Sequence, residues 1–175
     1  MASYFITGNA GTGKSSVIRV LQERGFTAYD IDEHPDIHAF IDTKDNSILD
    51  NFPEVTSHGS EAFTRYDAIF KESVLKQLLD SDKTVFLSGS STLQAEFYPL
   101  FHTIFGLVLP LEMLDQRLAT RTNNPTGANP ADRAYLLNVN DDIEAKLHEA
   151  GAVMIDASQP IEKVVDEITG YVSEG

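Results

Sequence analysis

The segment at residues 8–16, GNAGTGKSS, constrains the fold of this chain more than any other. Gly8, Gly13, Lys14 and Ser15 match the pattern G-x-x-x-x-G-K-[ST]. The apolar run SYFITG leads into it, and an amphipathic segment follows, with Val17, Ile18, Val20 and Leu21 on one helical face. A strand, a glycine-rich turn and a helix in this order predict a loop that binds the phosphates of a nucleoside triphosphate. The alternative is a glycine-rich turn that binds nothing.

Each residue type in this loop has a physical reason to be there. The glycines permit close backbone approaches that a Cβ would obstruct, so successive N–H groups can face phosphate oxygens. Lys14 supplies a mobile charge between the β- and γ-phosphates, and the Ser15 hydroxyl is a magnesium ligand. We expect ATP and Mg²⁺ as cofactors, although the sequence does not decide between ATP and another nucleotide. The expected nucleotide-binding residues are Gly8, Asn9, Ala10, Gly11, Thr12, Gly13, Lys14, Ser15 and Ser16.

Apolar runs alternate with helical patterns along the whole chain. The expected strands are residues 3–8, 27–32, 84–89, 103–110 and 152–156, and the expected helices are residues 14–24, 60–79, 111–121, 130–150 and 160–172. This alternation predicts an α/β fold with a five-stranded, mainly parallel sheet and helices on both faces. Together with the phosphate loop, it indicates a three-layer P-loop NTPase fold. Residues 34–59 are less regular. At 175 residues, we expect one domain.

Composition narrows the classes of partner and compartment. The formal net charge is -14, from 27 acidic and 13 basic residues, which argues against a broad nucleic-acid-binding face. The chain contains no cysteine, so it forms no disulfide and no cysteine zinc site. No apolar run approaches membrane-spanning length. We therefore expect a cytoplasmic protein with no nucleic-acid or membrane partner, and its oligomeric state stays open.

With the phosphate loop in place, the sequence resembles the small P-loop kinases, which include shikimate kinase, gluconate kinase and the nucleoside monophosphate kinases. The sequence DID at residues 30–32 resembles the D-x-D element of shikimate kinase. The alternate spacing would point both carboxylates to one side of an extended strand. The resemblance implies that Asp30 helps hold hydrated magnesium and that Asp32 engages an acceptor hydroxyl. Either carboxylate could instead be solvated at the strand end or cap a helix.

The third expected strand ends in VFLSGSS, without the acidic residue common in other P-loop proteins. Shikimate kinase has a similar glycine-rich turn there, which implies that Ser88, Gly89 and Ser90 line an acceptor pocket. Alternatively, these residues form only a tight turn with no role in binding.

Arg117 and Arg121 in the segment EMLDQRLATRTNNPTG resemble the R-x-x-x-R entrance to the lid of adenylate kinase and its relatives. The resemblance implies contacts with the nucleotide from both arginines, Arg121 at the γ-phosphate, and a lid at about residues 121–133 that hinges near Pro125, Gly127 and Pro130. Arg133 would add a second lid cation near the acceptor. Alternatively, the arginines pair with Glu112, Asp115 or solvent on an exposed helix.

The same resemblance implies that an insertion at about residues 34–66 covers the acceptor, with Arg65 as an anion-binding side chain, and that Ala157, Ser158 and Gln159 lie beside the base. His34, His38 and His58 have no metal-binding spacing, so each is expected on the surface or in the core. The aromatic residues Phe40, Phe52, Phe63 and Tyr66 could pack on a base or sugar, or belong to a helix-facing core.

We predict an ATP-dependent phosphotransferase that moves the γ-phosphoryl group to a small-molecule acceptor of the nucleoside, nucleotide or polyol class, with Lys14, Asp32 and Arg121 as catalytic residues. The first alternative is a nucleotide-binding regulatory switch with no small-molecule acceptor. The chain lacks the N/T-K-x-D guanine motif that GTPases usually carry. The second alternative is a kinase-shaped protein without turnover.

Overall fold

A five-stranded parallel sheet forms the centre of the structure, a computed structural model that describes residues 2–50, 64–80, 83–122, 127 and 129–172. The strands are β1 (Ser3–Thr7), β2 (Thr27–Asp30), β6 (Val85–Ser88), β7 (Thr103–Val108) and β8 (Val153–Asp156). They lie in the order β2-β6-β1-β7-β8, with every neighbouring pair parallel. The predicted sheet is therefore confirmed.

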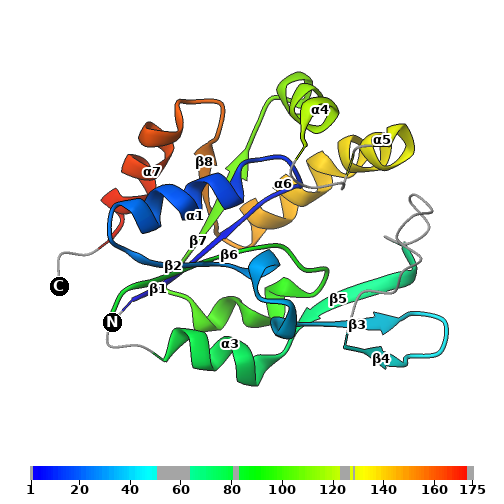
Figure 1. Ribbon diagram of the computed structural model, residues 1–175. Helices are drawn as coiled ribbons and strands as arrows, with labels where there is room; N and C mark the ends of the chain where they lie inside the picture. The colour runs from blue at the N-terminus through cyan, green and yellow to red at the C-terminus, as the bar shows by residue number, and fades with distance from the viewer. Residues whose placement is uncertain (1, 51–63, 81–82, 123–126, 128, 173–175) are drawn as a thin grey trace.

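Helices cover both faces of this sheet (Figure 1). Helices α1 (Lys14–Glu23) and α7 (Ile161–Gly170) pack on one face, and α3 (Glu72–Leu79) and α6 (Asn140–Glu149) pack on the other. Helices α4 (Leu111–Thr120) and α5 (Pro130–Asn138) lie beside each other near the phosphate loop. No helix within the described residues is long and apolar enough to cross a membrane.

Strand β1 is buried on both of its faces, as a central parallel strand must be. Tyr4 and Ile6 pack into one apolar cluster with residues of α1 and α7. Phe5, between them, packs into a second cluster that includes Leu75 of α3 and Phe70. Because successive side chains of a strand point to opposite faces, this strand joins the two halves of the core.

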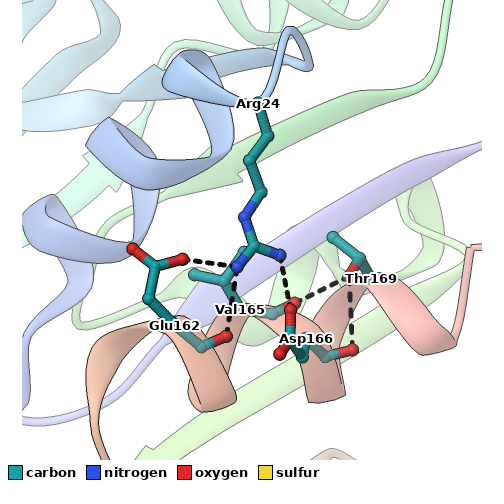
Figure 2. A network of polar contacts seen from close by, with 5 residues as sticks. All are labelled: Arg24, Glu162, Val165, Asp166 and Thr169. Carbon is teal, nitrogen blue, oxygen red and sulfur yellow. Dashed lines mark hydrogen bonds and ion pairs between the residues drawn. The ribbon is translucent and has the colours of Figure 1, made fainter.

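Helix α1 carries the phosphate loop at its start and is fixed at its end. Gly25, with φ +84°, terminates it, and the N–H groups of Gly25 and Phe26 donate to the carbonyls of Gln22 and Leu21 at 2.9 and 3.0 Å. Arg24 reaches across to α7, where its guanidinium contacts the carboxylates of Glu162 and Asp166 at 2.5 and 2.7 Å (Figure 2).

A second, antiparallel sheet stands apart from the central one, with two strands in the region expected to be irregular and one in the helix expected at residues 60–79. It consists of β4 (Ile48–Leu49), β3 (His38–Asp42) and β5 (Tyr66–Phe70), in the order β4-β3-β5. The short 3₁₀ turns η1 (Ile31–Glu33) and η2 (Pro35–Ile37) connect it to β2. This small sheet continues the chain from the end of β2, so it lies beside the phosphate loop.

Two of the expected helices were wrong in extent. Residues 66–70 of the helix predicted at 60–79 form β5, because they pair with β3 along its whole length, and the helical residues on either side of it are 64–65 and 72–79. Residues 60–63 lie outside the described residues. The helix predicted at 130–150 is two helices, α5 and α6, which meet at Val139.

Candidate active site

A cavity of about 1570 Å³ lies at the carboxyl ends of the central strands. Its wall includes all nine residues of the predicted phosphate loop, and Asp32, Arg117 and Arg121 line it as well. The small antiparallel sheet, the segment after β6 and the helices α5 and α6 contribute the remaining walls. Ligands of open α/β sheets bind at this edge.

The phosphate loop has the backbone shape that the glycines predict. Gly8 has φ +144°, and a Cβ there would lie 2.6 Å from the carbonyl oxygen of Leu107. Gly13 has φ +103° and comes directly before α1, whose first N–H groups have no intrahelical partner. Ser15 and Ser16 in the first turn are exposed and line the cavity. The loop and the helix start therefore fit a polyphosphate anion.

Lys14 holds the loop closed on itself. Its Nζ donates to the carbonyl oxygens of Gly8 and Asn9 at 2.9 and 3.0 Å. Burial lowers the pKa of Lys14 to about 8, the carboxylates of Asp32 and Asp30 oppose that shift, and the Arg121 charge adds to it. These three charges therefore act on the ammonium group that is expected to meet the phosphates.

The Asn9 side chain ties the phosphate loop to α5 and α6. Its Nδ2 donates to the carbonyl oxygen of Leu136 at 2.8 Å and to Oδ1 of Asn140 at 3.0 Å, and its Oδ1 accepts from the N–H of Ala10 at 2.8 Å. Asn140 in turn donates to Glu144 at 2.9 Å. The phosphate-loop motif predicts the position of Asn9 but not this connection, because the partners of its side chain lie more than 120 residues away.

The two aspartates of DID do not share one side of a strand, so that prediction was wrong. Strand β2 ends at Asp30, and the chain turns into η1 at Ile31. Asp30 is 4% exposed, and its Oδ1 accepts from the N–H of Asp32 at 3.1 Å, which caps the turn. Asp32 is exposed and lines the cavity, whereas Asp30 does not.

The three predicted arginines have different surroundings. Arg117 donates to the carbonyl oxygens of Thr12 at 3.3 Å and Ala157 at 3.0 Å, so it joins the phosphate loop to the segment after β8. Arg121, just after α4, lines the cavity, and its charge interacts with Asp32. Arg133 pairs with Asp115 at 3.1 Å and does not line the cavity. That pair is one of the alternatives the sequence left open.

The structure does not bring Arg65 and Gly89 to the cavity wall. Arg65 lies at 2.7 Å from Oδ2 of Asp42, with its guanidinium carbon 5.1 Å from the centre of the Tyr66 ring. Gly89 is packed under Ile31, where a Cβ would meet a side-chain carbon at 2.7 Å. Ser88 is completely buried, and Ser90 is the member of this turn that lines the cavity. An acceptor-binding role for Arg65, Gly89 and Arg133 therefore has no geometric support.

Several cavity residues have no chemical pattern in the sequence. His38 and Phe40 of β3 and Tyr66 of β5 line the cavity, so the histidine and these two aromatic residues belong to the site. Gln94 and Tyr98 of η4 (Gln94–Leu100) line it too and are joined by a hydrogen bond of 2.8 Å. His58, Phe52 and Phe63 lie outside the described residues.

The segment after β8 reaches the cavity as expected for a base-binding loop. Ala157 and Gln159 line the wall, whereas the Ser158 hydroxyl donates to Oδ1 of Asp156 at 2.5 Å. Of the lid at 121–133, residues 123–126 and 128, including Pro125, lie outside the described residues. Gly127 adopts φ +83°, consistent with a turn.

The residues present fit a magnesium ion bound together with a nucleotide. Within the described residues, no group of three or more His, Asp or Glu side chains could hold a metal alone. Magnesium in phosphate sites needs fewer protein ligands, because it keeps several waters and takes oxygens from the substrate phosphates. The exposed Ser15 hydroxyl at the start of α1 would be the protein ligand of such an ion, and Asp32 lines the same cavity.

Comparison with known proteins places the fold among solved structures. The chain matches no protein-family model and no curated protein. Shikimate kinase from Acinetobacter baumannii in complex with shikimate matches 98% of this chain and 93% of its own, at 19% identity and a TM-score of 0.66. A gluconokinase from Sinorhizobium meliloti matches 95% of this chain and 88% of its own, at 17% identity and a TM-score of 0.55.

Deoxyadenosine kinase from M. mycoides with bound dATP matches 98% of this chain and all of its own, at 13% identity and a TM-score of 0.56. These three proteins are small P-loop kinases with different acceptors. Their shared arrangement confirms the predicted fold, and identities this low carry no acceptor over. The chain has the fold of the small P-loop kinases.

Proposed function

We propose that the protein is a phosphotransferase that uses ATP and Mg²⁺ and moves the γ-phosphoryl group to a hydroxyl of a small molecule. One observation carries this proposal: Lys14, Asp32 and Arg121 come from three separate elements and line one cavity, in which their charges act on one another. The fold supports it, since the matching structures include kinases of three different small molecules.

In the proposed reaction, the N–H groups of residues 8–15 and the start of α1 hold the phosphate chain, and Lys14 leaves the carbonyls of Gly8 and Asn9 to contact it. Bound magnesium would neutralise phosphate charge, with Ser15 as its ligand. Phosphoryl transfer depends mainly on positioning and charge stabilisation, because the protein itself forms no covalent bond.

Asp32 aligns the acceptor hydroxyl and accepts its proton as the acceptor oxygen bonds to the γ-phosphorus and the bond to the β–γ bridging oxygen breaks. The products are ADP and the phosphorylated acceptor. Arg121 stabilises the charge on the transferred group, an effect of about 10³- to 10⁵-fold in rate where an arginine acts this way.

The test is a transfer screen with γ-³²P-labelled ATP and Mg²⁺ against nucleosides, nucleotides and polyols. We expect a labelled product from at least one class, and its loss in Arg121→Ala. Saturable nucleotide binding without a labelled product from any class would contradict the proposal. If capture of a protein partner then depended on the nucleotide, the regulatory switch would be favoured instead.

A further inference from the structure

One part of the cavity wall, formed by the cavity-lining residues of β3, β5 and the segment 90–98, carries aromatic rings in place of cations. We call it the acceptor wall. In the register of the small sheet, Phe40 lies opposite Ala68, and Tyr66 lies opposite Asp42. Since side chains alternate along a strand, His38, Phe40, Tyr66 and Ala68 share the face that lines the cavity. The small Ala68 side chain leaves room beside the Phe40 ring.

The acceptor wall has no lysine or arginine among the described residues. The basic residues that line the cavity are Lys14, Arg117, Arg121 and Lys146, all from other elements. Arg65, the arginine closest in sequence, is held by Asp42 through Nε at 3.1 Å and Nη2 at 2.7 Å. The acceptor wall therefore offers no cation to an anionic group, such as a carboxylate or phosphate, on the acceptor.

The described residues around the small sheet have the same bias. Within residues 34–50 and 64–66, acidic residues stand at positions 36, 42, 45 and 50, against the two basic residues Lys44 and Arg65. A carboxylate or phosphate that loses water without gaining a positive partner is strongly unfavourable, so the acceptor wall disfavours an anionic acceptor.

The wall does provide neutral hydrogen-bonding groups. Oε1 of Gln94 accepts from the Thr7 hydroxyl and from the N–H of Ser91, each at 3.1 Å, which fixes the amide so that Nε2 donates to the Tyr98 hydroxyl at 2.8 Å. An amide nitrogen accepts no hydrogen bond, so the proton of the Tyr98 hydroxyl can be donated to a ligand. Burial raises the pKa of Tyr98, which keeps that proton in place.

His38 adds a further polar group that is uncharged at neutral pH. Its ring stacks on Phe40, with ring centres 6.0 Å apart, and hydrogen-bonds to the backbone of Ser90. Burial lowers its pKa, although the Asp32 charge opposes that shift. The His38 and Phe40 rings thus lie next to each other near the carboxylate proposed to receive the acceptor proton.

We propose that the phosphoryl acceptor is an uncharged alcohol that carries a flat ring, of the nucleoside kind, bound by Phe40, Tyr66 and the donor hydroxyl of Tyr98. This inference rests on the proposed function. It separates the chain from a kinase of hydroxy acids or of nucleoside monophosphates, whose acceptors bring a negative charge to this wall.

Binding is measured first, so that a failure of catalysis does not hide the acceptor class. Calorimetric titrations of the protein with Mg²⁺ and a non-hydrolysable ATP analogue use nucleosides, the matching 5′-monophosphates, shikimate and gluconate. We expect at least one nucleoside to bind at least tenfold more tightly than its own 5′-monophosphate and than either hydroxy acid. Tighter binding of any anionic compound, or no binding by any nucleoside, overturns the inference.

The same compounds are then offered with labelled ATP. Transfer to a hydroxy acid or a monophosphate in preference to every nucleoside overturns this inference and leaves the proposed function standing. Nucleoside binding without transfer to any compound contradicts the proposed function, and the nucleoside is then a ligand of the cavity and not a phosphoryl acceptor.

Two variants and one control locate the site on the acceptor wall. Phe40→Ala removes a ring, and we expect KM for the nucleoside to rise about 5- to 100-fold, as for loss of base stacking on an aromatic side chain, with KM for ATP unchanged. Ile41→Ala is the control, because Ile41 is the next residue of β3 and points to the other face of the sheet.

Tyr98→Phe keeps the ring and removes only the hydroxyl, so it stays informative if Phe40→Ala does not fold. We expect KM for the nucleoside to rise about tenfold in this variant. An unchanged KM for the nucleoside in both variants, or an equal rise in Ile41→Ala, would remove the acceptor wall from the binding site.

Discussion

Lys14 has a charge that nucleotide binding should change. In the free protein its pKa is about 8, because burial outweighs the attraction of Asp32 and Asp30. A bound polyphosphate favours the ammonium form and so raises that pKa, which means that binding takes up a proton near and above pH 8. Affinity is then independent of pH well below 8, where Lys14 is protonated in both states.

Above pH 8 we expect the affinity for a non-hydrolysable ATP analogue to fall by up to about tenfold per pH unit, until the pKa of the complex is reached. Calorimetry between pH 6.5 and 9.5, in two buffers of different ionisation enthalpy, measures both the affinity and the proton uptake. Lys14→Met should bind weakly and without this uptake. Constant affinity to pH 9.5 with no proton uptake in the unmodified protein would show that Lys14 does not contact the phosphates.

Asp32 is the other residue whose charge decides a specific step. In Asp32→Asn the shape of the side chain is kept, but it no longer accepts the acceptor proton, so we expect kcat to fall by roughly 10²- to 10⁴-fold. Affinity for the ATP analogue should stay close to that of the unmodified protein. Because Asp32 raises the pKa of Lys14, the pH at which affinity begins to fall should also move downward.

For Asp32→Asn, steady-state kinetics with the best acceptor measure kcat, and the same calorimetric titration measures the affinity for the ATP analogue. Unchanged transfer would remove Asp32 from the proposed role. A large loss of analogue affinity would instead place this carboxylate in metal or nucleotide binding, nearer to the role first expected of Asp30.

At the scale of elements, the connection between α1 and α7 can be tested apart from the cavity. Arg24 at the end of α1 contacts both Glu162 and Asp166 in the first turns of α7 (Figure 2). Its positive charge also interacts favourably with the negative, C-terminal end of the α1 helix dipole. We expect Arg24→Ala to lower Tm, and the difference from the unmodified protein to narrow as the salt concentration rises.

The matched control is Arg19→Ala, since among the described residues Arg19 pairs within α1, with Glu23 at 3.5 Å, and both side chains are largely exposed. Thermal unfolding followed by circular dichroism at low and high salt measures both variants. Equal changes in Tm for the two substitutions would mean that the contact between the helices adds nothing to stability.

The elements that could be predicted from the sequence are those with a local signal. The phosphate loop and the alternating apolar runs are read within short windows, and all five central strands and α1, α4 and α7 occur as expected. Strand β5 could not be found this way. Tyr66 to Phe70 precede a helical pattern and become a strand only because β3, more than 20 residues earlier, pairs with them.

The candidate site divides in the same way. The residues of the phosphate loop, Asp32, Arg117 and Arg121 were predicted and line the cavity. Asp30 was misplaced because the spacing of DID indicates one side only while the strand continues, and the chain turns at Ile31. No sequence pattern marks Gln94 and Tyr98 as site residues. Their role in the cavity depends on the hydrogen bond between them and on the one that Gln94 accepts from Thr7, which is far away in the sequence.

At the scale of the whole molecule, the cavity lies between two sheets that share no strand and are connected by side-chain packing. Phe5 of β1 is completely buried and stacks on Phe101 with ring centres 5.0 Å apart. It also meets Phe70 of the small sheet edge to face at 6.0 Å. Phe5 therefore connects the central sheet, which carries the phosphate loop, to the sheet that carries the acceptor wall.

If the chain folds as one cooperative unit, Phe5→Ala should lower the free energy of unfolding by about 3–5 kcal/mol, the usual cost of such a cavity. That is a large share of the roughly 5–15 kcal/mol available to a domain. Urea unfolding followed by both circular dichroism and tyrosine fluorescence measures it, and we expect a single coincident transition.

Ile48→Ala is the control, because Ile48 on the short edge strand β4 is 69% exposed and should change stability by no more than about 0.5 kcal/mol. Two separate transitions in Phe5→Ala would show that the chain does not unfold as one cooperative unit. An acceptor should then stabilise the transition of the part that carries the acceptor wall, by an amount set by its concentration relative to Kd. A single transition would instead mean that a ligand at either half of the cavity stabilises the whole chain.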